Sequence, residues 1–454
     1  MKFQLCDSVP DLASIIITPT TDLPANVKQG EWDFNGEEIP KITFYIKADA
    51  TEKEVCHQFR LFAHKSNHRW GDVPVIDFSD FQGNEAAAVK GLALNNYRLD
   101  SLKSEKKSEG ERCLSIIGTK SDSKVLNDAE IEAEVQMRIM ELVDMPPNKK
   151  TPEYLGHWAR ESAKKFGYDC EVWNDDHVIS EKLFALHAVG KGSKNDPVFI
   201  ISKFFGRGGE DIDLALVGKG ITFDTGGISI KPSANMHYMK CDMAGAAGVL
   251  GAIELAARTK LKLNIAVIVP SAENSVDAES TLPGDVINTY SGKTVEVIDT
   301  DAEGRLILAD GISWAIRNLK PTRVIDMATL TGSSVRALGY EAAALYSSSQ
   351  ELSDQLYKAG LDSGDKCWPM PLWKDYDNYM DSDVADIANL SAKPVAGSIS
   401  AAKFLEAFTD EHPIWAHIDM PGVAFQSSPF AKNKSATGYG IALFRTFMQN
   451  LATD

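Results

Sequence analysis

The chain has 454 residues, of which 44% are hydrophobic and 24% are charged. This length is comfortable for two domains, and the composition is ordinary for a globular protein with a sizeable core. The formal net charge of −17 disfavours broad binding to nucleic acids or anionic membranes. The sequence has no apolar run of membrane-spanning length and no signal-peptide pattern near its start, so we expect no membrane partner and a cytoplasmic location.

The cysteines are scattered singly along the chain, and none forms a Cys-x-x-Cys pair. A zinc site built from thiolates is therefore not expected. In residues 1–120, strand candidates occur at 41–46 and 113–118, and His64 and His68 have helical i, i+4 spacing. No carboxylate or cysteine near these histidines has suitable spacing to complete a metal site, and this part shows no catalytic constellation.

A helix is predicted at about 127–143. Asn127 can cap its start, Glu130 stands at the reciprocal capping position, and apolar residues repeat at helical spacing up to Leu142. Pro146 and Pro147 then end it. We interpret residues 121–149 as a linking helix and turn between two domains.

From residue 150 onward, apolar strand candidates alternate with helical segments. The strands are expected at 197–201, 214–218, 263–269, 323–328 and 414–419, and the helices at about 244–259, 303–317 and 399–408. Such alternation favours an α/β domain with a mixed central sheet. The predicted fold is thus a smaller N-terminal α/β domain (1–120), joined by a helix to a larger C-terminal catalytic α/β domain (150–454).

Two segments of the larger domain carry candidate chemistry. The segment 297–306 places Asp301 and Glu303 two residues apart, with Arg305 two further on. The segment 217–231 places Lys219 and Asp224 just after a strand candidate, and it is followed by Lys231 and Asp242. In open α/β sheets, ligands bind beyond the carboxyl ends of strands, which is where these residues are expected.

The four aspartates and glutamates of these segments would repel one another if they gathered without cations. Two divalent metal ions would remove that conflict, could share a carboxylate such as Asp224 or Glu303, and could together activate a water and polarise a carbonyl. Lys219 could bind metal as a neutral amine, and Lys231 could stay protonated and stabilise an oxyanion. The spacing favours this assignment of the two lysines but leaves the reverse open.

These segments resemble the two signature regions of the cytosol (leucine) aminopeptidase family. Supporting similarity lies in Pro283-Gly284-Asp285, Ser291-Gly292-Lys293-Thr294, Ala328-Thr329-Leu330-Thr331-Gly332 and Trp415-Ala416-His417-Ile418-Asp419. The resemblance covers roughly residues 145–440. Departures from the family pattern include Asp299, where asparagine is usual, and Pro421 and Ala424 near the expected substrate pocket.

The resemblance implies a metal-dependent aminopeptidase that acts on short peptides with a free N-terminus. It implies two divalent ions per chain, which are zinc or manganese, or else magnesium or cobalt, and it implies a homohexamer. Asp224 and Glu303 would be shared by both ions. The implied metal ligands are Lys219, Asp224, Asp242, Asp301 and Glu303.

For catalysis, the resemblance implies Lys231 and Arg305, with Arg305 holding a bicarbonate that transfers protons. The implied substrate-binding residues are Met239, Thr329, Leu330 and Gly332. Two other functions compete with this one. A dinuclear phosphoesterase would commonly recruit histidines, whereas these segments offer carboxylates and lysines. A DNA-binding accessory protein fits poorly with the charge of −17 and an intact ligand set.

Overall fold

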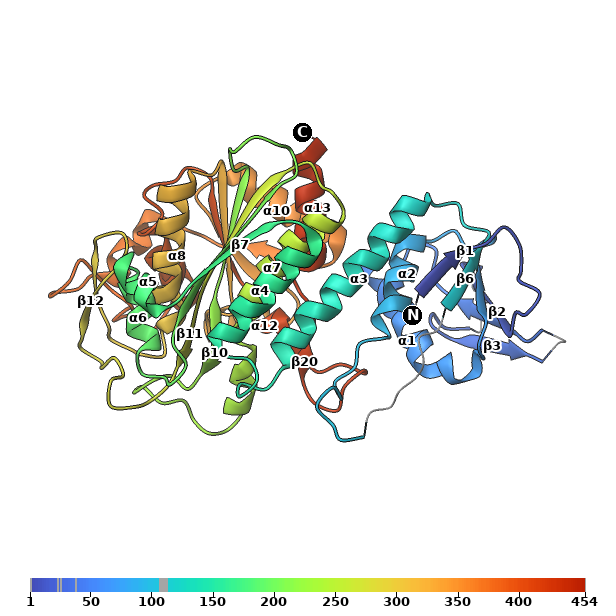
Figure 1. Ribbon diagram of the computed structural model, residues 1–454, viewed down its shortest axis with the longest axis horizontal. Coiled ribbons are helices and arrows are strands. Elements are labelled where there is room, and N and C mark those ends of the chain that lie inside the picture. The colour runs from blue at the N-terminus through green and yellow to red at the C-terminus, as the bar shows by residue number, and fades with distance from the viewer. Residues whose placement is uncertain (1, 23, 25–26, 37–38, 106–112, 454) are drawn as a thin grey trace. The chain divides into compact units, whose positions relative to one another are not determined.

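The computed structural model describes residues 2–22, 24, 27–36, 39–105 and 113–453 (Figure 1). The chain forms two compact units, and each is described by itself. The first contains Met1–Met137 and Ser428–Lys432, and the second contains Arg138–Ser427 and Asn433–Asp454. The candidate site residues all belong to the second unit.

The first unit is a mixed sheet with two packed helices. Its strand order is β1-β6-β5-β2-β4-β3, in which only the edge pair β3/β4 is antiparallel. Its elements are β1 (Lys2–Leu5), β2 (Ile15–Thr20), β3 (Trp32–Asn35), β4 (Lys41–Tyr45), α1 (Glu52–Ser66), η1 (Asn67–Arg69), β5 (Pro74–Asp77), α2 (Glu85–Leu94) and β6 (Cys113–Ile117). Thr51 and Glu54 form a capping box that starts α1.

Aromatic side chains fill the core of this first unit. The Phe44 ring stacks on Phe62 with centroids 4.4 Å apart and meets Phe59 edge-on at 5.1 Å. The rings of His57 and His64 each meet the ring of Phe430 edge-on, with centroids 5.9 and 5.5 Å apart. Helix α3 (Ser123–Asp144) contains the boundary between the two units, and the helix predicted at about 127–143 lies within it.

The second unit is built on a large mixed sheet of order β16-β15-β18-β14-β9-β11-β8-β7, with β10 paired to β11. The central strands β18, β14, β9 and β11 run parallel. Strand β8 pairs antiparallel with β11 and with β7, and β15 pairs antiparallel with β18 but parallel with β16. Its strands are β7 (Asp169–Trp173), β8 (Val198–Phe205), β9 (Leu214–Gly218), β10 (Gly220–Asp224), β11 (Asn264–Asn274), β14 (Arg323–Ala328), β15 (Ala343–Ser347), β16 (Cys367–Pro369) and β18 (Trp415–Asp419).

Two smaller sheets complete the strands of this unit. Strand β13 pairs with β12 and β17 in one, and β19 pairs with β20 in the other. Their bounds are β12 (Val286–Asn288), β13 (Thr294–Glu296), β17 (Ile387–Ala388), β19 (Phe425–Gln426) and β20 (Ser435–Ala436). Strand β13, which pairs with β17, ends directly before the segment 297–306 that carries Asp301 and Glu303.

Helices cover both faces of the large sheet. Figure 1 shows α6 and α8 on one side of it and α4, α7 and α13 on the other. The helices are α4 (Pro152–Phe166), α5 (Asp175–Ser180), α6 (Phe184–Gly190), η2 (Met236–Cys241), α7 (Ala244–Arg258), α8 (Glu303–Leu319), α9 (Gly332–Leu338), α10 (Gln350–Ser363), η3 (Lys374–Met380), α11 (Gly397–Glu406), α12 (Pro421–Ala424) and α13 (Ile441–Thr453). The predicted α/β fold with a mixed central sheet is confirmed.

Burial on both faces explains the composition of the central strands. Every residue of β9, with the sequence Leu-Ala-Leu-Val-Gly, is buried, as is typical of a parallel strand covered by helices on both sides. Helix α7 is rich in alanine and glycine because it lies close to the sheet. A Cβ atom at Gly245 would collide with the carbonyl of Met327 in β14.

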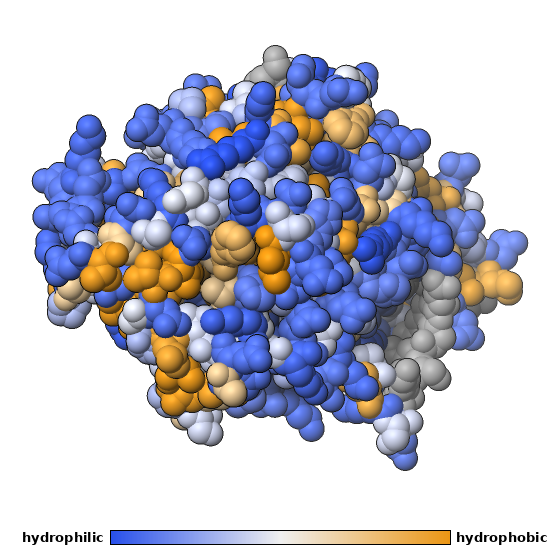
Figure 2. Space-filling view, turned by 60° about the vertical axis from the view of Figure 1, so that its left-hand side comes forward, coloured by the Kyte–Doolittle hydropathy of each residue, from blue (hydrophilic) through white to orange (hydrophobic). Residues whose placement is uncertain are grey.

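No helix among the described residues is long and apolar enough to cross a bilayer. The face drawn in Figure 2 is mostly hydrophilic, and its apolar residues form separate small patches.

Candidate metal centre

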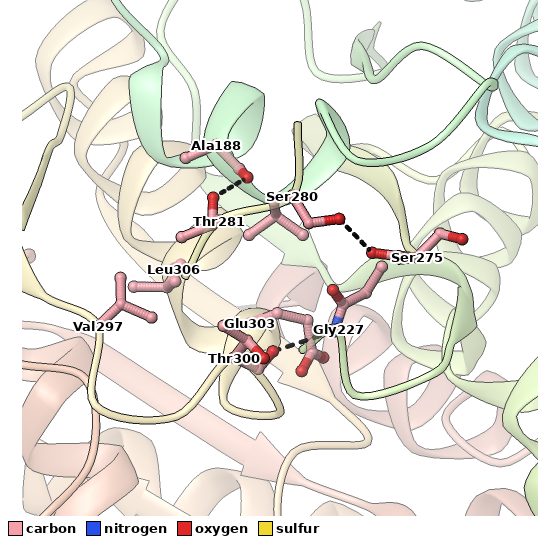
Figure 3. A pocket seen from close by; sticks show the side chains of 11 residues that line it. Ala188, Gly227, Ser275, Ser280, Thr281, Val297, Thr300, Glu303 and Leu306 are labelled. Carbon is pink, nitrogen blue, oxygen red and sulfur yellow. Dashed lines mark hydrogen bonds between the residues drawn. The ribbon is translucent and has the colours of Figure 1, made fainter. Parts of the chain in front are cut away.

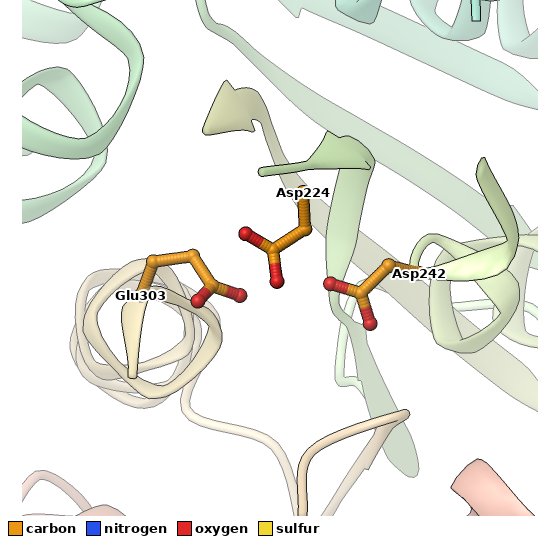
Figure 4. A group of neighbouring side chains, drawn as sticks. All are labelled: Asp224, Asp242 and Glu303. Atoms are coloured by element: carbon orange, nitrogen blue, oxygen red, sulfur yellow. The ribbon is translucent and has the colours of Figure 1, made fainter. Parts of the chain in front are cut away.

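Three carboxylates meet beyond the carboxyl ends of the central strands. Asp224 ends β10, Asp242 follows η2, and Glu303 is the first residue of α8. One oxygen from each lies within 4.8 Å of the others, and Figure 4 shows the three side chains turned toward a common point. All three side chains are buried. The two sequence segments, which lie about 80 residues apart, therefore converge as predicted.

Lys219 lies inside this group. Its Nζ is 2.8 Å from Oδ2 of Asp242 and 3.0 Å from Oε1 of Glu303, and it donates to the carbonyl oxygen of Thr329 at 2.9 Å. Only 4% of its side chain is exposed. Burial alone would lower the pKa of Lys219, but the charges of Asp242 and Glu303 outweigh burial and raise it.

Lys231 contacts the other pair of carboxylates. Its Nζ is 2.8 Å from Oδ2 of Asp224 and also forms an ion pair with Asp301. The side chains of Lys231 and Asp301 are 20% and 34% exposed, so this end of the site is open to solvent. Asp301 is joined to the buried group through Lys231 and is not itself within the cluster of Asp224, Asp242 and Glu303.

A glycine turn lets Lys231 reach this position. Gly226 and Gly227 have φ values of +89° and +63°, which L side chains rarely adopt. A Cβ atom at Gly226 would lie 2.9 Å from Oδ1 of Asp301. The absence of a side chain at Gly226 thus lets the turn lie close to Asp301.

Negative charge exceeds positive charge in the centre, because two lysines face four carboxylates. Burial raises the pKa of Glu303 to about 8, and the charge of Asp224 adds to this shift. Burial likewise raises the pKa of Asp242 to about 6, although Lys219 opposes the shift. Burial is the largest cause of both shifts, and the nearby charge of Asp224 raises both pKa values further.

The donor set fits divalent metal ions. Oε2 of Glu303 is buried and has no hydrogen-bond partner among the described residues. A buried acceptor left in this way costs free energy, and a metal ion bound there would satisfy it. Carboxylate oxygens with one amine nitrogen are ligands that suit hard and borderline divalent ions.

Arg305 lies in the first turn of α8 and is 5% exposed. Its Nη1 donates to the carbonyl oxygen of Asn389 at 2.7 Å, whereas its Nε has no partner among the described residues. Burial lowers the pKa of Arg305 to about 10, so the guanidinium is still charged at neutral pH. It is therefore a buried cation with a donor available to an anion.

The four predicted substrate residues lie on two segments at the same edge of the sheet. Met239 is in η2, three residues before Asp242, and Thr329, Leu330 and Gly332 follow β14. Thr329 Oγ1 donates to Oδ1 of Asp242 at 2.7 Å, so this residue also holds a candidate metal ligand.

Sequence analysis missed side chains that support the centre. Nδ2 of Asn274, at the end of β11, donates to Oδ1 of Asp224 at 2.8 Å. Asp419, at the end of β18, accepts from the amides of Leu330 and Thr331 at 2.9 and 3.1 Å. Both residues end a strand at the sheet edge where the three carboxylates meet, and this position was the available signal for finding them.

A cavity adjoins Glu303 on the side of the 275–281 loop (Figure 3). Of the candidate metal ligands, only Glu303 lines it. Hydroxyl side chains form much of its wall, and Thr281 Oγ1 donates to the carbonyl of Ala188 at 2.5 Å. The lining residues are Ala188, Val189, Gly227, Asn274, Ser275, Ser280, Thr281, Val297, Thr300, Glu303 and Leu306.

Comparison with known proteins agrees with this site. Residues 138–445 match the model of the cytosol aminopeptidase family, catalytic domain. A relative from Chlorobium limicola, named "Probable cytosol aminopeptidase", is 41% identical over 392 residues, which cover 81% of this chain and 78% of the relative. Another of that name, from Chlorobaculum parvum, is 43% identical over 361 residues and covers 79% and 72%.

Solved structures share the whole fold. The bottromycin maturation enzyme BotP in complex with Mn has a TM-score of 0.85 and 28% identity, with 97% of this chain and 100% of that chain covered. Leucyl aminopeptidase from Leishmania major in complex with actinonin has a TM-score of 0.84 and 24% identity, with 99% and 94% covered, which supports the fold alone. The protein belongs to the cytosol aminopeptidase family and is a hydrolase of the metal-dependent aminopeptidase class.

Proposed function

We propose that this protein removes the N-terminal residue from short peptides, using two divalent metal ions per chain. The observation that carries the proposal is the convergence of Asp224, Asp242 and Glu303 around Lys219, with more negative than positive charge in a buried site. Two ions bound there would activate a water and polarise the scissile carbonyl.

We assign the metal ligands by position. Asp224 and Glu303 are the most central carboxylates and would be shared by both ions, and Asp242 and Asp301 would each complete one side. Lys219 would bind as the neutral amine, because a dication beside it favours loss of its proton. Its buried location and its contacts to Asp242 and Glu303 support this role.

Lys231 would act on the substrate. It is more exposed than Lys219 and lies beyond the Gly226-Gly227 turn, where its ammonium can donate to the oxygen of the attacked carbonyl. Such a donor stabilises the transition state more than the substrate, because negative charge develops on that oxygen. In this role Lys231 stays protonated, which agrees with a pKa that Asp224 and Glu303 raise against the effect of burial.

Arg305 would hold a bicarbonate that transfers protons beside the metal ions. The buried Nε without a partner and the charged guanidinium suit a small planar anion. Met239, Thr329, Leu330 and Gly332 would contact the substrate. A free α-amine would bind one metal ion, so an N-acetylated peptide should be a poor substrate.

We further propose zinc or manganese as the bound ions, with magnesium or cobalt as substitutes, and a cytoplasmic homohexamer as the working form. The solved relative BotP was determined with Mn, and the curated relatives carry the word cytosol in their names. Light scattering of an active preparation tests the hexamer, and a stable, fully active monomer would contradict it.

The decisive experiment is an assay of apo protein reconstituted separately with zinc, manganese, magnesium and cobalt. The substrates are a panel of amino-acid p-nitroanilides and matched peptides with free and acetylated N-termini. We expect metal-dependent cleavage of the free N-termini only. Equal cleavage of free and acetylated peptides would refute an aminopeptidase mechanism.

A further inference from the structure

Asn389 is a buried side chain that contacts the catalytic segment without touching a candidate metal ligand side chain. It has no exposed surface and follows β17. Strand β17 pairs in parallel with β13, with Glu296 opposite Ala388. Because β13 ends just before the loop that carries Asp301, the pairing places Asn389 beside that loop.

The carboxamide of Asn389 continues the hydrogen-bond ladder after the strands have ended. Its Oδ1 accepts from the amides of Ile298 and Asp299, at 2.8 and 3.2 Å. Its Nδ2 donates to the carbonyl of Asp299 at 2.7 Å and, more weakly, to that of Ala302 at 3.5 Å. The side chain thus holds the loop on both sides of Asp301.

The backbone of Asn389 adds two further contacts to the same segment. Its amide donates to the carbonyl of Glu296 at 2.9 Å, and its carbonyl accepts from Nη1 of Arg305 at 2.7 Å. One residue therefore contacts the strand before the loop, the loop itself and the arginine in the first turn of α8. Thr300 anchors the same loop to the glycine turn by donating to the carbonyl of Gly226 at 2.7 Å.

We infer that Asn389 is a positioning residue that fixes Asp301 and Arg305 relative to Glu303. The inference rests on the proposed function, because it assigns Asp301 to a metal ion and Arg305 to the anion. Mutation of a residue that orients metal ligands through hydrogen bonds, without binding the metal itself, typically lowers metal affinity or activity by about 10–100-fold. Asn389 fits that description, because it binds backbone groups on both sides of Asp301.

Asn264 provides a matched control. It is also fully buried, its Oδ1 accepts from the amide of Arg207 at 3.1 Å, and its Nδ2 donates to the carbonyls of Gly208 and Asp211 at 2.9 Å each. It begins β11, whose last residue is Asn274 at the metal centre. The strand separates the two positions by about 33 Å.

The experiment compares Asn389→Ser and Asn389→Asp with Asn264→Ser. Hydrogen exchange of the apo proteins reports on the amides of Ile298 and Asp299, and calorimetry reports on the binding of Mn²⁺. We expect Asn389→Ser to lose protection at these amides, whereas Asn389→Asp keeps an acceptor for them and loses the donation from Nδ2 to the carbonyls of Asp299 and Ala302. Both variants should bind the second ion about 10–100-fold more weakly. Their kcat should fall by a similar factor with little change in KM, because the lost alignment matters most in the transition state.

Asn264→Ser should lower the melting temperature as much as Asn389→Ser does, with Mn²⁺ binding and kcat unchanged. If the Asn389 variants lose stability but keep loop protection, Mn²⁺ affinity and kcat, the role is only structural and the inference fails. It also fails if neither Asn389 variant folds while Asn264→Ser does. An inactive parent enzyme would refute the proposed function, whereas the exchange and Mn²⁺ measurements would still decide the role of Asn389.

Discussion

Lys219 Nζ lies 2.8 Å from Oδ2 of Asp242, inside the buried group of carboxylates. Lys231 instead contacts Asp224 and Asp301 at the more exposed end of the site. The two lysines of one sequence segment thus occupy different environments. This difference favours Lys219 as a metal ligand and Lys231 as the group that faces the substrate.

We expect Lys231→Ala to keep the fold and both metal ions while kcat falls by about 10²–10³-fold, as the loss of one oxyanion donor does elsewhere. KM should change much less, because the interaction strengthens mainly in the transition state. Lys219→Ala should weaken one metal site. Steady-state kinetics and elemental analysis of both variants provide the test. Loss of an ion in Lys231→Ala, with two ions retained in Lys219→Ala, would exchange the two roles.

Metal stoichiometry is the second prediction. Reconstituted protein should contain about two ions per chain, and chelation should abolish its activity. Asp301→Ala should lose at least one ion. Among the described residues, the carboxylates that contact Lys231 are those of Asp224 and Asp301, so no third carboxylate is in place to substitute for Asp301. The exposed residue Asp169, in β7, supplies the control Asp169→Ala, which should keep both ions. A fully active preparation with one ion per chain would be incompatible with the two-metal assignment.

The sequence predicted the central strands well, because burial on both faces requires a continuous apolar run. The strand expected at 214–218 is β9, and that at 323–328 is β14. The sequence pattern did not predict strand β10, since only Lys219 separates it from β9. A strand that contains a ligand and follows another after one residue has no separate pattern of its own.

The candidate site was predicted as a set of residues but not as a geometry. The positions of Asp224 and Glu303 near the ends of predicted elements indicated that both lie at one edge of the sheet. In the structure their carboxylates do lie together. Asn389 had no such signal, because it lies more than 80 residues from the loop that it holds and an isolated asparagine is usually a turn residue. Its contacts depend on the pairing of β13 with β17, which single-sequence patterns do not reveal.

The third prediction concerns pH. Burial and Asp224 raise the pKa of Glu303 to about 8 in the folded, metal-free protein, well above its ordinary value of 4.5. Between these values the folded state binds more protons than the unfolded state, so the contribution of this group to stability falls as pH rises through that window. A metal ion needs the ionised carboxylate, so metal binding should release protons and strengthen over the same range.

Melting temperatures with and without Mn²⁺, measured from about pH 5 to about pH 8.5, test this linkage. We expect the stabilisation by Mn²⁺ to increase steadily with pH. In Glu303→Gln, which cannot ionise, both the stabilisation and its pH dependence should be strongly reduced. A Mn²⁺ effect that is independent of pH in the parent protein would contradict a protonated Glu303 in the apo state.

The last prediction concerns Gly304, which lies between Glu303 and Arg305 in the first turn of α8. A Cβ atom here would lie 2.7 Å from Nζ of Lys219 and still closer to its Cε. Alanine normally stabilises an exposed helix position by about 0.5–1 kcal/mol relative to glycine. In Gly304→Ala we instead expect Lys219 to be displaced from Asp242 and Glu303, with weaker binding of one metal ion.

Gly311→Ala, two turns later in the same helix, is the control. A Cβ atom there would meet side-chain carbons of Pro270 and Val217 at 3.1 Å, which small shifts can relieve, and Lys219 is not among its neighbours. Calorimetric titration with Mn²⁺ should therefore give near-parent affinity for Gly311→Ala and a weakened site for Gly304→Ala. If Gly304→Ala binds both ions with the affinity of the parent protein and melts at a higher temperature, the prediction is wrong. Metal binding then does not depend on the present position of Lys219.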